Sequence, residues 1–289
     1  MSTGRILVAG AGGQLGTVIV RTFAEAEVVA LGRGDLDITD PVAVRERLHA
    51  ERPSLVVNCA AFNDVDGAED APTTALAVNA FAVRSLARAA EEVGATLVHY
   101  GTDFVFDGET SRPYLETDEP GPRNTYAASK LLGEWFAAEA PRAFVLRVES
   151  LFGCDPGWRG RRGTLDTIVD GLEQGRDVRV FTDRVVSPSY LEDVAAATRF
   201  LVTSRAPHGL YHCVNSGRGT WHEVALEAAR LLGLTPRFQL TTMSQVTLRA
   251  ARPRYCALDN RKLAAAGFAM PSWQDALGRW LKMKRYTHG

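Results

Sequence analysis

The feature that most constrains this chain is a glycine-rich segment near its start, Gly10-Ala11-Gly12-Gly13-Gln14-Leu15-Gly16. It follows a short apolar stretch at residues 5–9, and apolar residues recur after it at helical spacing: Leu15, Val18, Ile19 and Phe23. Glycine permits a tight turn here and lets backbone N–H groups approach a pyrophosphate at the positive end of a helix. The segment therefore predicts a strand–turn–helix unit that binds a dinucleotide. The simpler interpretation is a tight turn that only allows close helix–strand packing.

Strand-like and helix-like segments alternate through the first half of the chain. We expect strands at 28–31, 55–59, 96–100 and 144–148, and helices after Asp40-Pro41 and at about 73–93 and 125–138. This alternation is typical of a parallel sheet with crossover helices. We therefore predict an α/β fold, a Rossmann-like doubly wound parallel sheet with a smaller α/β substrate-binding lid domain.

The alternation weakens after about Gly153, where a loop rich in Gly and Arg begins. We expect residues 1–153 to form the NADP(H)-binding Rossmann domain, with a segment at about 182–206 returning to it. Residues 154–181 and 207–289 are expected to form the smaller substrate-binding domain.

Composition excludes several classes of protein. Lys plus Arg is 33 and Asp plus Glu is 34, which gives a net charge of -1, so a nucleic-acid partner held by phosphate contacts is not expected. No apolar run approaches the roughly 18 residues of a membrane span, and the start shows no signal-peptide pattern. The four cysteines are scattered, so we expect neither disulfides nor a metal site, and a cytoplasmic location.

The end of the second predicted strand bears on the choice of cofactor. An acid there usually holds the ribose 2′-OH of NAD, whereas NADP needs positive charge for its 2′-phosphate. Here the strand runs into Gly32-Arg33-Gly34, and Arg33 can pair with a phosphate. We therefore predict NADPH, with NADH possible because Asp35 and Asp37 lie close by. Arg33 as a solvated turn residue is the alternative.

Tyr126 and Lys130 are four residues apart in a predicted helix and so lie on one face of it. An ammonium group beside a phenol stabilises the phenolate and makes the phenol a better acid near neutral pH. Thr102 ends a preceding predicted strand, and its hydroxyl can hydrogen-bond a substrate carbonyl. The same residues could also be a half-buried helix face and a strand-end cap.

Three motifs carry a resemblance to a known family: Gly10 to Gly16, Thr102-Asp103-Phe104-Val105-Phe106-Asp107-Gly108, and Tyr126 to Lys130. With them the chain resembles an extended short-chain dehydrogenase/reductase, and more narrowly the dTDP-4-dehydrorhamnose reductase family. The resemblance implies NADPH-dependent reduction of the 4-keto group of a nucleotide-linked, dTDP-type 4-keto-6-deoxy sugar, as in deoxysugar biosynthesis. A homodimer is also expected.

The resemblance assigns roles to individual residues. It assigns catalysis to Thr102, Tyr126 and Lys130. Cofactor binding falls to Gly10, Gly13, Gln14, Leu15, Gly16, Arg33, Asp37, Ile38, Ala60, Ala61, Phe62, Tyr126 and Lys130. Substrate binding falls to Thr102, Asp103, Phe104, Val65, Ser150 and Arg252.

Residues 147–153 depart from the pattern of the resembled family. That family usually reads Arg-Thr-Ser-Trp-Val-Tyr-Gly here, whereas this chain reads Arg147-Val148-Glu149-Ser150-Leu151-Phe152-Gly153. Ser150 takes the place of the indole that commonly borders the sugar, which predicts a wider or more polar pocket. Some members hold magnesium with a Glu two residues after the third glycine, but Val18 stands there, so no metal is carried over.

Arginines are grouped in two predicted loops and could pair with a diphosphate: Arg159, Arg161 and Arg162, and Arg249, Arg252 and Arg254. Solvated loops carry arginine equally often, and Arg252 is the candidate by family position.

Two other functions stay open from the sequence. A non-catalytic NADP-binding subunit would resemble the regulatory β-subunit of methionine adenosyltransferase, and the altered segment 148–152 keeps that alternative open. Dehydratase chemistry commonly needs carboxylates after the catalytic Thr; Asp103 is present, but Phe104 follows it, which disfavours dehydration.

Overall fold

The computed structural model describes residues 4–154, 158, 160 and 162–286. Six parallel strands form its central sheet in the order β10-β5-β4-β3-β1-β2. They are β1 (Ile6–Ala9), β2 (Val28–Leu31), β3 (Leu55–Asn58), β4 (Thr96–Thr102), β5 (Ala143–Val148) and β10 (Gly209–His212). The strands β1, β3, β4 and β5 are buried almost throughout, as expected when helices cover both faces of a parallel sheet. The predicted doubly wound α/β class is confirmed.

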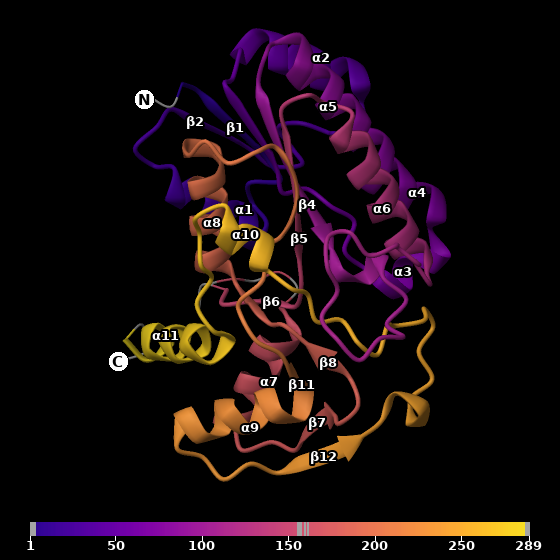
Figure 1. Ribbon diagram of the computed structural model, residues 1–289, viewed down its shortest axis with the longest axis vertical. Coiled ribbons are helices and arrows are strands. Elements are labelled where there is room, and N and C mark those ends of the chain that lie inside the picture. Colours follow the sequence, from indigo (N-terminus) through magenta and orange to yellow (C-terminus); the bar gives the residue numbers. More distant parts are fainter. Residues whose placement is uncertain (1–3, 155–157, 159, 161, 287–289) are drawn as a thin grey trace.

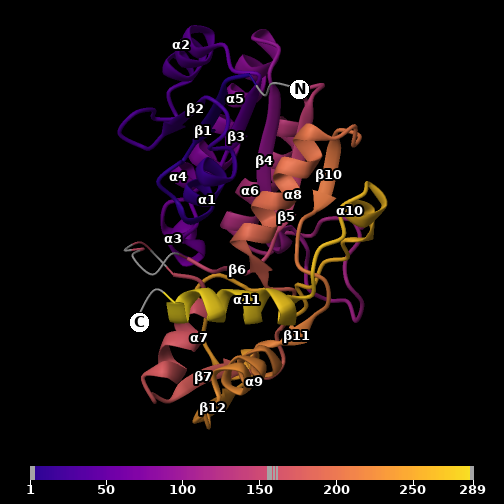
Figure 2. The same cartoon turned by 90° about the vertical axis from the view of Figure 1, so that its left-hand side faces the viewer.

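Helices cover both faces of this sheet (Figures 1 and 2). One face carries α1 (Gln14–Thr22), α8 (Leu191–Thr203) and α10 (Arg261–Ala265), whose apolar side chains share one buried cluster with the sheet. The other face carries α2 (Pro41–Glu51), α5 (Ala82–Glu92) and α6 (Thr125–Ala138) around a second cluster. The short helices α3 (Val65–Asp70) and α4 (Pro72–Leu76) lead through a π-helical turn, η1 (Ala77–Phe81), into α5.

The remaining elements lie below the main sheet in Figure 1 around a separate apolar cluster. They include α7 (Thr164–Glu173), α9 (Trp221–Leu232) and α11 (Trp273–Tyr286), with β7 (Val178–Phe181) paired to β12 (Phe238–Thr241). Two-residue strands complete this part: β6 (Leu151–Phe152) with β9 (Ser189–Tyr190), and β8 (Val185–Val186) with β11 (Gly219–Thr220). Single helical turns occur at η2 (Asp103–Val105) and η3 (Met243–Gln245). Within the described part of the chain, no helix combines the length and the apolar character needed to cross a membrane.

One boundary of the predicted domain division is wrong. The sequence analysis assigns residues 207–289 to the smaller domain, but β10 pairs in parallel with β5, with Tyr211 opposite Leu146. The segment 209–212 is therefore the edge strand of the main sheet. The side chain of Tyr211 packs in the same apolar cluster as α1 and α8. The rest of the two-domain division stays a prediction.

The strand register places the ends of β1 and β3 on one row with His99, which lies inside β4, and β4 continues to Thr102. Ala9 lies opposite Asn58, and Asn58 lies opposite His99. Because parallel strands point the same way, the segments that follow β1, β3 and β4 emerge at the same edge of the sheet. The order reverses between β1 and β3, and this is where doubly wound sheets bind ligands.

Two glycines allow the turn after β1 to contact its neighbours closely. Gly10 has a φ of 72°, and a Cβ there would lie 2.5 Å from the backbone nitrogen of Ala60. A Cβ on Gly16 would lie 2.2 Å from the carbonyl oxygen of Gly10. Gly12 differs, because a Cβ on it would meet no atom within 4 Å.

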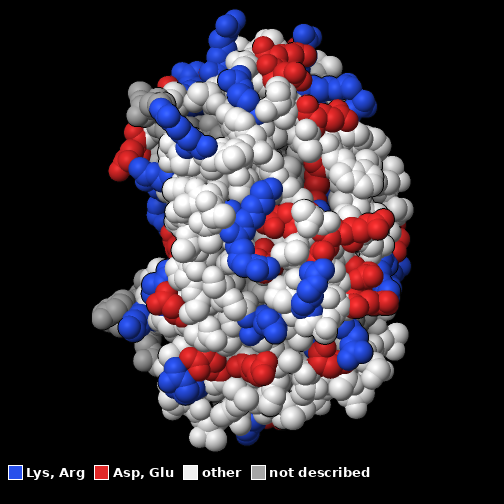
Figure 3. Space-filling model, viewed as in Figure 1, with Lys and Arg blue, Asp and Glu red and all other residues white. Residues whose placement is uncertain are grey.

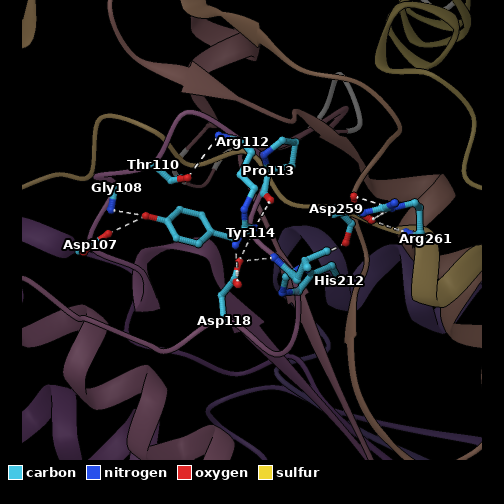
Figure 4. A network of polar contacts seen from close by, with 11 residues as sticks. Asp107, Gly108, Thr110, Arg112, Pro113, Tyr114, Asp118, His212, Asp259 and Arg261 are labelled. Carbon is cyan, nitrogen blue, oxygen red and sulfur yellow. Dashed lines mark hydrogen bonds and ion pairs between the residues drawn. The ribbon is translucent and has the colours of Figure 1, made fainter.

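Tyr114 holds the loop that follows η2 (Figure 4). Its hydroxyl donates to Asp107 Oδ1 at 2.6 Å and accepts from the Gly108 N–H at 2.9 Å. Its own backbone N–H donates to the carbonyl of Ala257. A Cβ on Gly108 would lie 2.7 Å from the backbone nitrogen of Arg254, so the loop packs directly on the 253–257 segment. The Asp107-Gly108 end of the motif therefore has a structural role.

We predict that Gly16→Ala destabilises the protein by about 3 kcal/mol, because the atoms that its Cβ would meet are backbone atoms that cannot move aside. Gly12→Ala is the matched control and should change stability by no more than about 1 kcal/mol. Chemical denaturation followed by circular dichroism measures both. Equal stability of the two variants would contradict the close packing of this turn.

Candidate active site

The turn between β1 and α1 leaves the start of a helix without a capping side chain. Gly13 is the N-cap residue of α1, and no side chain caps it. The Ala11 N–H donates to the carbonyl of Leu31 at 3.0 Å, which ties the turn to the end of β2. Gln14 and Leu15 begin the helix, and Leu15 is buried against the sheet. The predicted residues Gly10, Gly13, Gln14, Leu15 and Gly16 thus surround one positive helix end.

The segment after β2 carries the residues predicted to select the cofactor. Arg33 is exposed in a turn that Asp35 closes, because Asp35 Oδ2 accepts from the Gly32 N–H at 2.9 Å. Asp37 Oδ1 accepts from the N–H and the hydroxyl of Thr39, and these hydrogen bonds lower the pKa of Asp37. Both acids are therefore bonded within their own turn, and Ile38 is buried beside it.

The segment after β3 is fixed by a residue that the sequence analysis did not identify. Asn79 lies in the π-helical turn η1 and bonds both backbone groups of Phe62: its Oδ1 accepts from the N–H at 2.8 Å and its Nδ2 donates to the carbonyl at 3.0 Å. Ala60 is held by Asn58, whose Oδ1 accepts from its N–H. The predicted cofactor residues Ala60, Ala61 and Phe62 therefore form one braced segment.

The predicted catalytic and substrate residues come together where β4 ends. Thr102 is the last residue of β4, and Asp103 and Phe104 begin η2. Phe104 packs edge-on against Tyr126 of α6, with ring centroids 5.8 Å apart. Phe62 and Val65 belong to the same apolar cluster as Tyr126. The structure thus brings the segments after β3 and β4 onto one side chain of α6.

Helix α6 is placed by its N-cap and by a buried lysine. Asn124 Oδ1 accepts from the Ala127 N–H at 2.7 Å. One turn further on, Lys130 is buried and donates from Nζ to the carbonyl of Tyr100 at 2.6 Å. Burial lowers the pKa of Lys130 to about 8, although the nearby Glu134 carboxylate opposes this shift.

Ser150 lies between β5 and β6 in an unusual backbone conformation. Its φ is 43°, in the left-handed region that a residue with a side chain rarely adopts. Its hydroxyl donates to Glu149 Oε1 at 3.3 Å, while Glu149 Oε2 accepts from the N–H of Ser187. Glu149 thus holds the strained turn against the segment before β9.

Arg252 is bonded to a neighbouring helix. Its Nη2 lies 2.9 Å from Asp66 Oδ2 of α3, and its Nη1 donates to the carbonyl of Ala250. Asp66 is adjacent to Val65, so Arg252 borders the Tyr126 cluster. The other predicted arginines pair with acids as well: Arg162 with Asp170, Arg249 with Asp70, and Arg254 with Asp183. Arg159 and Arg161 lie outside the described residues.

A buried polar cluster beside Thr102 was not predicted as a unit. A carboxylate oxygen of Asp103, a carboxylate oxygen of Glu149 and the Sγ of Cys256 lie within 4.8 Å of one another, and all three residues are buried. Arg184 donates from Nη2 to Cys256 Sγ at 3.8 Å, and its guanidinium carbon lies 5.4 Å from the centre of the Phe104 ring. The one local signal is an acidic residue directly after the buried strand β5, and it marks Glu149.

The surface in Figure 3 shows Lys and Arg interspersed with Asp and Glu, without a large area of one sign. A surface of this kind gives no extended track for a polyanion. The anion sites that the residues suggest are local ones, at the start of α1 and at Arg33.

Comparisons with known proteins agree with this geometry. The family model described as "RmlD substrate binding domain" matches residues 4–286. The chain is 39% identical over 284 residues to a dTDP-4-dehydrorhamnose reductase of Streptomyces griseus, covering 94% of this chain and 91% of that protein. It is 38% identical to a probable dTDP-4,6-dihydroxy-2-methyloxan-3-one 4-ketoreductase of Streptomyces antibioticus, covering 94% and 93%.

A solved structure extends the likeness to three dimensions. The dTDP-4-dehydrorhamnose reductase of Bacillus anthracis in complex with NADP superposes with a TM-score of 0.91 at 30% identity, covering 97% of this chain and 99% of that one. The resemblance to this reductase family is thereby confirmed, while the roles of single residues stay predictions. The chain belongs to the RmlD substrate binding domain family, within the dTDP-4-dehydrorhamnose reductases.

Proposed function

We propose that this protein is an NADPH-dependent reductase of the 4-keto group of a dTDP-linked 4-keto-6-deoxy sugar. The observation that carries the proposal is the contact of Phe104 with Tyr126 at the sheet edge that also holds the glycine turn. Thr102 accepts from the Phe104 N–H, and Lys130 lies one turn along α6 from Tyr126. The Streptomyces griseus and Streptomyces antibioticus relatives support the reacting group, because both names place a dTDP-linked sugar and reduction at position 4. These names also favour an enzyme over a regulatory subunit.

The residues of the turn fit a dinucleotide. The space beside Gly12 is open, α1 starts without a side-chain cap, and its nine residues give a helix long enough to present a positive end. We propose that the N–H groups of Gln14 and Leu15 at the start of α1 hold the pyrophosphate and that Arg33 pairs with the 2′-phosphate. Ile38 would lie beside the adenine, and the braced segment 60–62 would border the nicotinamide. When bound, the reduced nicotinamide supplies a hydride.

In the proposed reaction the sugar ketone lies between Thr102 and Tyr126. Thr102 hydrogen-bonds the keto oxygen, and Tyr126 gives its phenolic proton to that oxygen as carbon 4 is reduced. Lys130 keeps positive charge near the phenol and so stabilises the phenolate that remains. Val65, Asp103, Phe104, Ser150 and Arg252 would border the sugar nucleotide. The expected homodimer and cytoplasmic location stay predictions.

We predict that Tyr126→Phe lowers kcat by about 100-fold to 10,000-fold, because it removes the proton donor and keeps the ring. NADPH binding, followed by its fluorescence, should stay within about threefold because the phenol is a minor contact of the cofactor. Tyr211→Phe is the matched control, since the Tyr211 hydroxyl donates to the Pro207 carbonyl at the far edge of the sheet. Loss of NADPH absorbance with a dTDP-4-keto-6-deoxy sugar gives the rate. Full activity of Tyr126→Phe would contradict the assignment.

We also predict that Arg33→Ala weakens NADPH binding by about 10-fold to 100-fold, as expected when a charge-assisted phosphate contact is lost. NADH binding should change much less, because NADH has no 2′-phosphate. The control is Arg88→Ala, which removes an exposed arginine from the middle of α5. Equal losses of affinity for NADPH and NADH would contradict the predicted phosphate contact.

A further inference from the structure

A pair of carboxyl groups is buried directly behind Thr102. Asp103 is 3% exposed and Glu149 is 1% exposed, and their oxygens lie within 4.8 Å of each other and of Cys256 Sγ. Asp103 follows β4, Glu149 follows β5, and Cys256 comes from the segment that packs on Gly108. The pair therefore forms only when these three parts of the chain are folded together.

The guanidinium of Arg184 faces this pair. Arg184, in the turn before β8, donates to Cys256 Sγ and lies close enough to attract both carboxylates. Two ionised carboxylates and one guanidinium would leave a net charge of −1 in a buried site, which is costly. One proton on the pair makes the site neutral. The guanidinium also opposes a metal ion at the same place.

Burial and mutual repulsion act on both carboxyl groups. Burial raises the pKa of Asp103 to about 6, with Arg184 opposing the shift. Burial, followed by the charge of Asp103, raises the pKa of Glu149 well above its ordinary value. Because the two groups interact, the proton belongs to the pair.

Hydrogen bonds reach both carboxyl groups of the pair. Glu149 accepts from the Ser187 N–H and the Ser150 hydroxyl, and such donors stabilise its ionised form. Asp103 Oδ2 has no nitrogen or oxygen donor among the described residues. Thr102 and Cys256 act in the same way on an ionised Asp103, so each carboxyl group has donors for its ionised form and the proton is shared between the two.

Asp103 also controls the hydroxyl that the proposed function uses. Thr102 Oγ1 lies 3.1 Å from Asp103 Oδ1 and accepts from the Phe104 N–H at 3.3 Å. An ionised Asp103 can only accept, so it captures the single Thr102 hydroxyl proton. A protonated Asp103 can donate to Thr102 Oγ1, which frees that hydroxyl proton for another acceptor.

We propose that Asp103 and Glu149 share one proton in the folded protein, and that this proton makes the Thr102 hydroxyl a hydrogen-bond donor toward the substrate ketone. The proposal rests on the proposed function, which places the ketone at Thr102. Glu149 is then a positioning residue that acts through Asp103. Its carboxylate is also the group that stands where the resembled family usually has Ser.

The shared proton can be measured without turnover. In protein labelled with ¹³C at the Asp and Glu carboxyl carbons, an NMR titration of the wild type should show one carboxyl of this pair staying protonated well above the ordinary range of about 3.9 to 4.3. In Glu149→Gln, Asp103 loses its like-charged neighbour and keeps Arg184, so its titration should move at least about one pH unit lower. Titration of both wild-type carboxyls in the ordinary range would overturn the proposal.

The pH dependence of kcat/KM tests the link to Thr102. Glu149→Gln should move the alkaline limb of the profile to lower pH, with about a tenfold loss for each unit of displacement. In Asp103→Asn, kcat/KM should not fall at alkaline pH on account of this pair, because the Asn amide can donate to Thr102 at every pH. Both variants keep Tyr126, Lys130 and the Arg184–Cys256 contact. Any pH dependence of kcat/KM that comes from these groups should therefore stay at the same pH.

Two further variants separate this role from a structural one. Asp107→Asn makes the same chemical change in the same loop, keeps an acceptor for Tyr114, and should leave the profile unmoved. Glu149→Ser supplies a second variant if Glu149→Gln does not fold, and it should show the same shift. A loss of activity that is equal at all pH values in both Glu149 variants would overturn the proposal.

If Asp103, Glu149 and Cys256 instead bind a metal ion, treatment with a chelator should change the activity. Activity that is lost on treatment with EDTA and restored by a divalent cation would also overturn the proposal. Absence of reductase activity in the wild type would refute the proposed function, while the NMR titration would still decide whether the proton is shared.

Discussion

The parallel pairing of β1, β3 and β4 is the constraint on which the rest of the structure depends. Its register sets Ala9 and Asn58, the last residues of β1 and β3, beside His99 of β4. Because the strands are parallel, the segments that follow them emerge at the same edge of the sheet. The glycine turn can pack against Ala60 only because Gly10 carries no Cβ, and α1 can start close to the turn because Gly16 carries none. Pairing and close packing together create the edge at which a helix end, a braced backbone segment and a strand-end threonine meet.

Helix α6 converts that edge into a site with acid–base groups. Lys130 reaches back to the carbonyl of Tyr100 on β4, which fixes the rotation of the helix and turns Tyr126 toward Phe104. The helix can approach this closely because Gly133 packs on the backbone of Asn79, where a Cβ would lie 2.0 Å from the Asn79 carbonyl oxygen. Asn79 in turn holds Phe62. The close packing of α6 on Asn79 therefore also sets the position of Phe62 at the site.

Much of this could be predicted from the sequence because the signals are local. The alternation of strand-like and helix-like apolar patterns predicted a doubly wound parallel sheet. The glycine spacing and the Tyr126–Lys130 pair indicated two parts of the site. The position of β10 could not be predicted, since strand order depends on contacts distant in the chain. Asp103, Glu149, Arg184 and Cys256 come from four separate segments, so no spacing shows that they meet. Asn79 lies in a continuous helical pattern, and that pattern does not show the π-helical turn that directs its side chain.

The central claim is that this site delivers a hydride to carbon 4 of a nucleotide-linked keto sugar. The most direct measurement uses NADPH deuterated at the transferring position of nicotinamide C4, together with a dTDP-4-keto-6-deoxyhexose, and locates the label in the product by NMR and mass spectrometry. The account predicts one deuterium, bonded to sugar C4, and an equal amount of oxidised cofactor. Label at another carbon, or cofactor that stays reduced while the sugar binds, would contradict it.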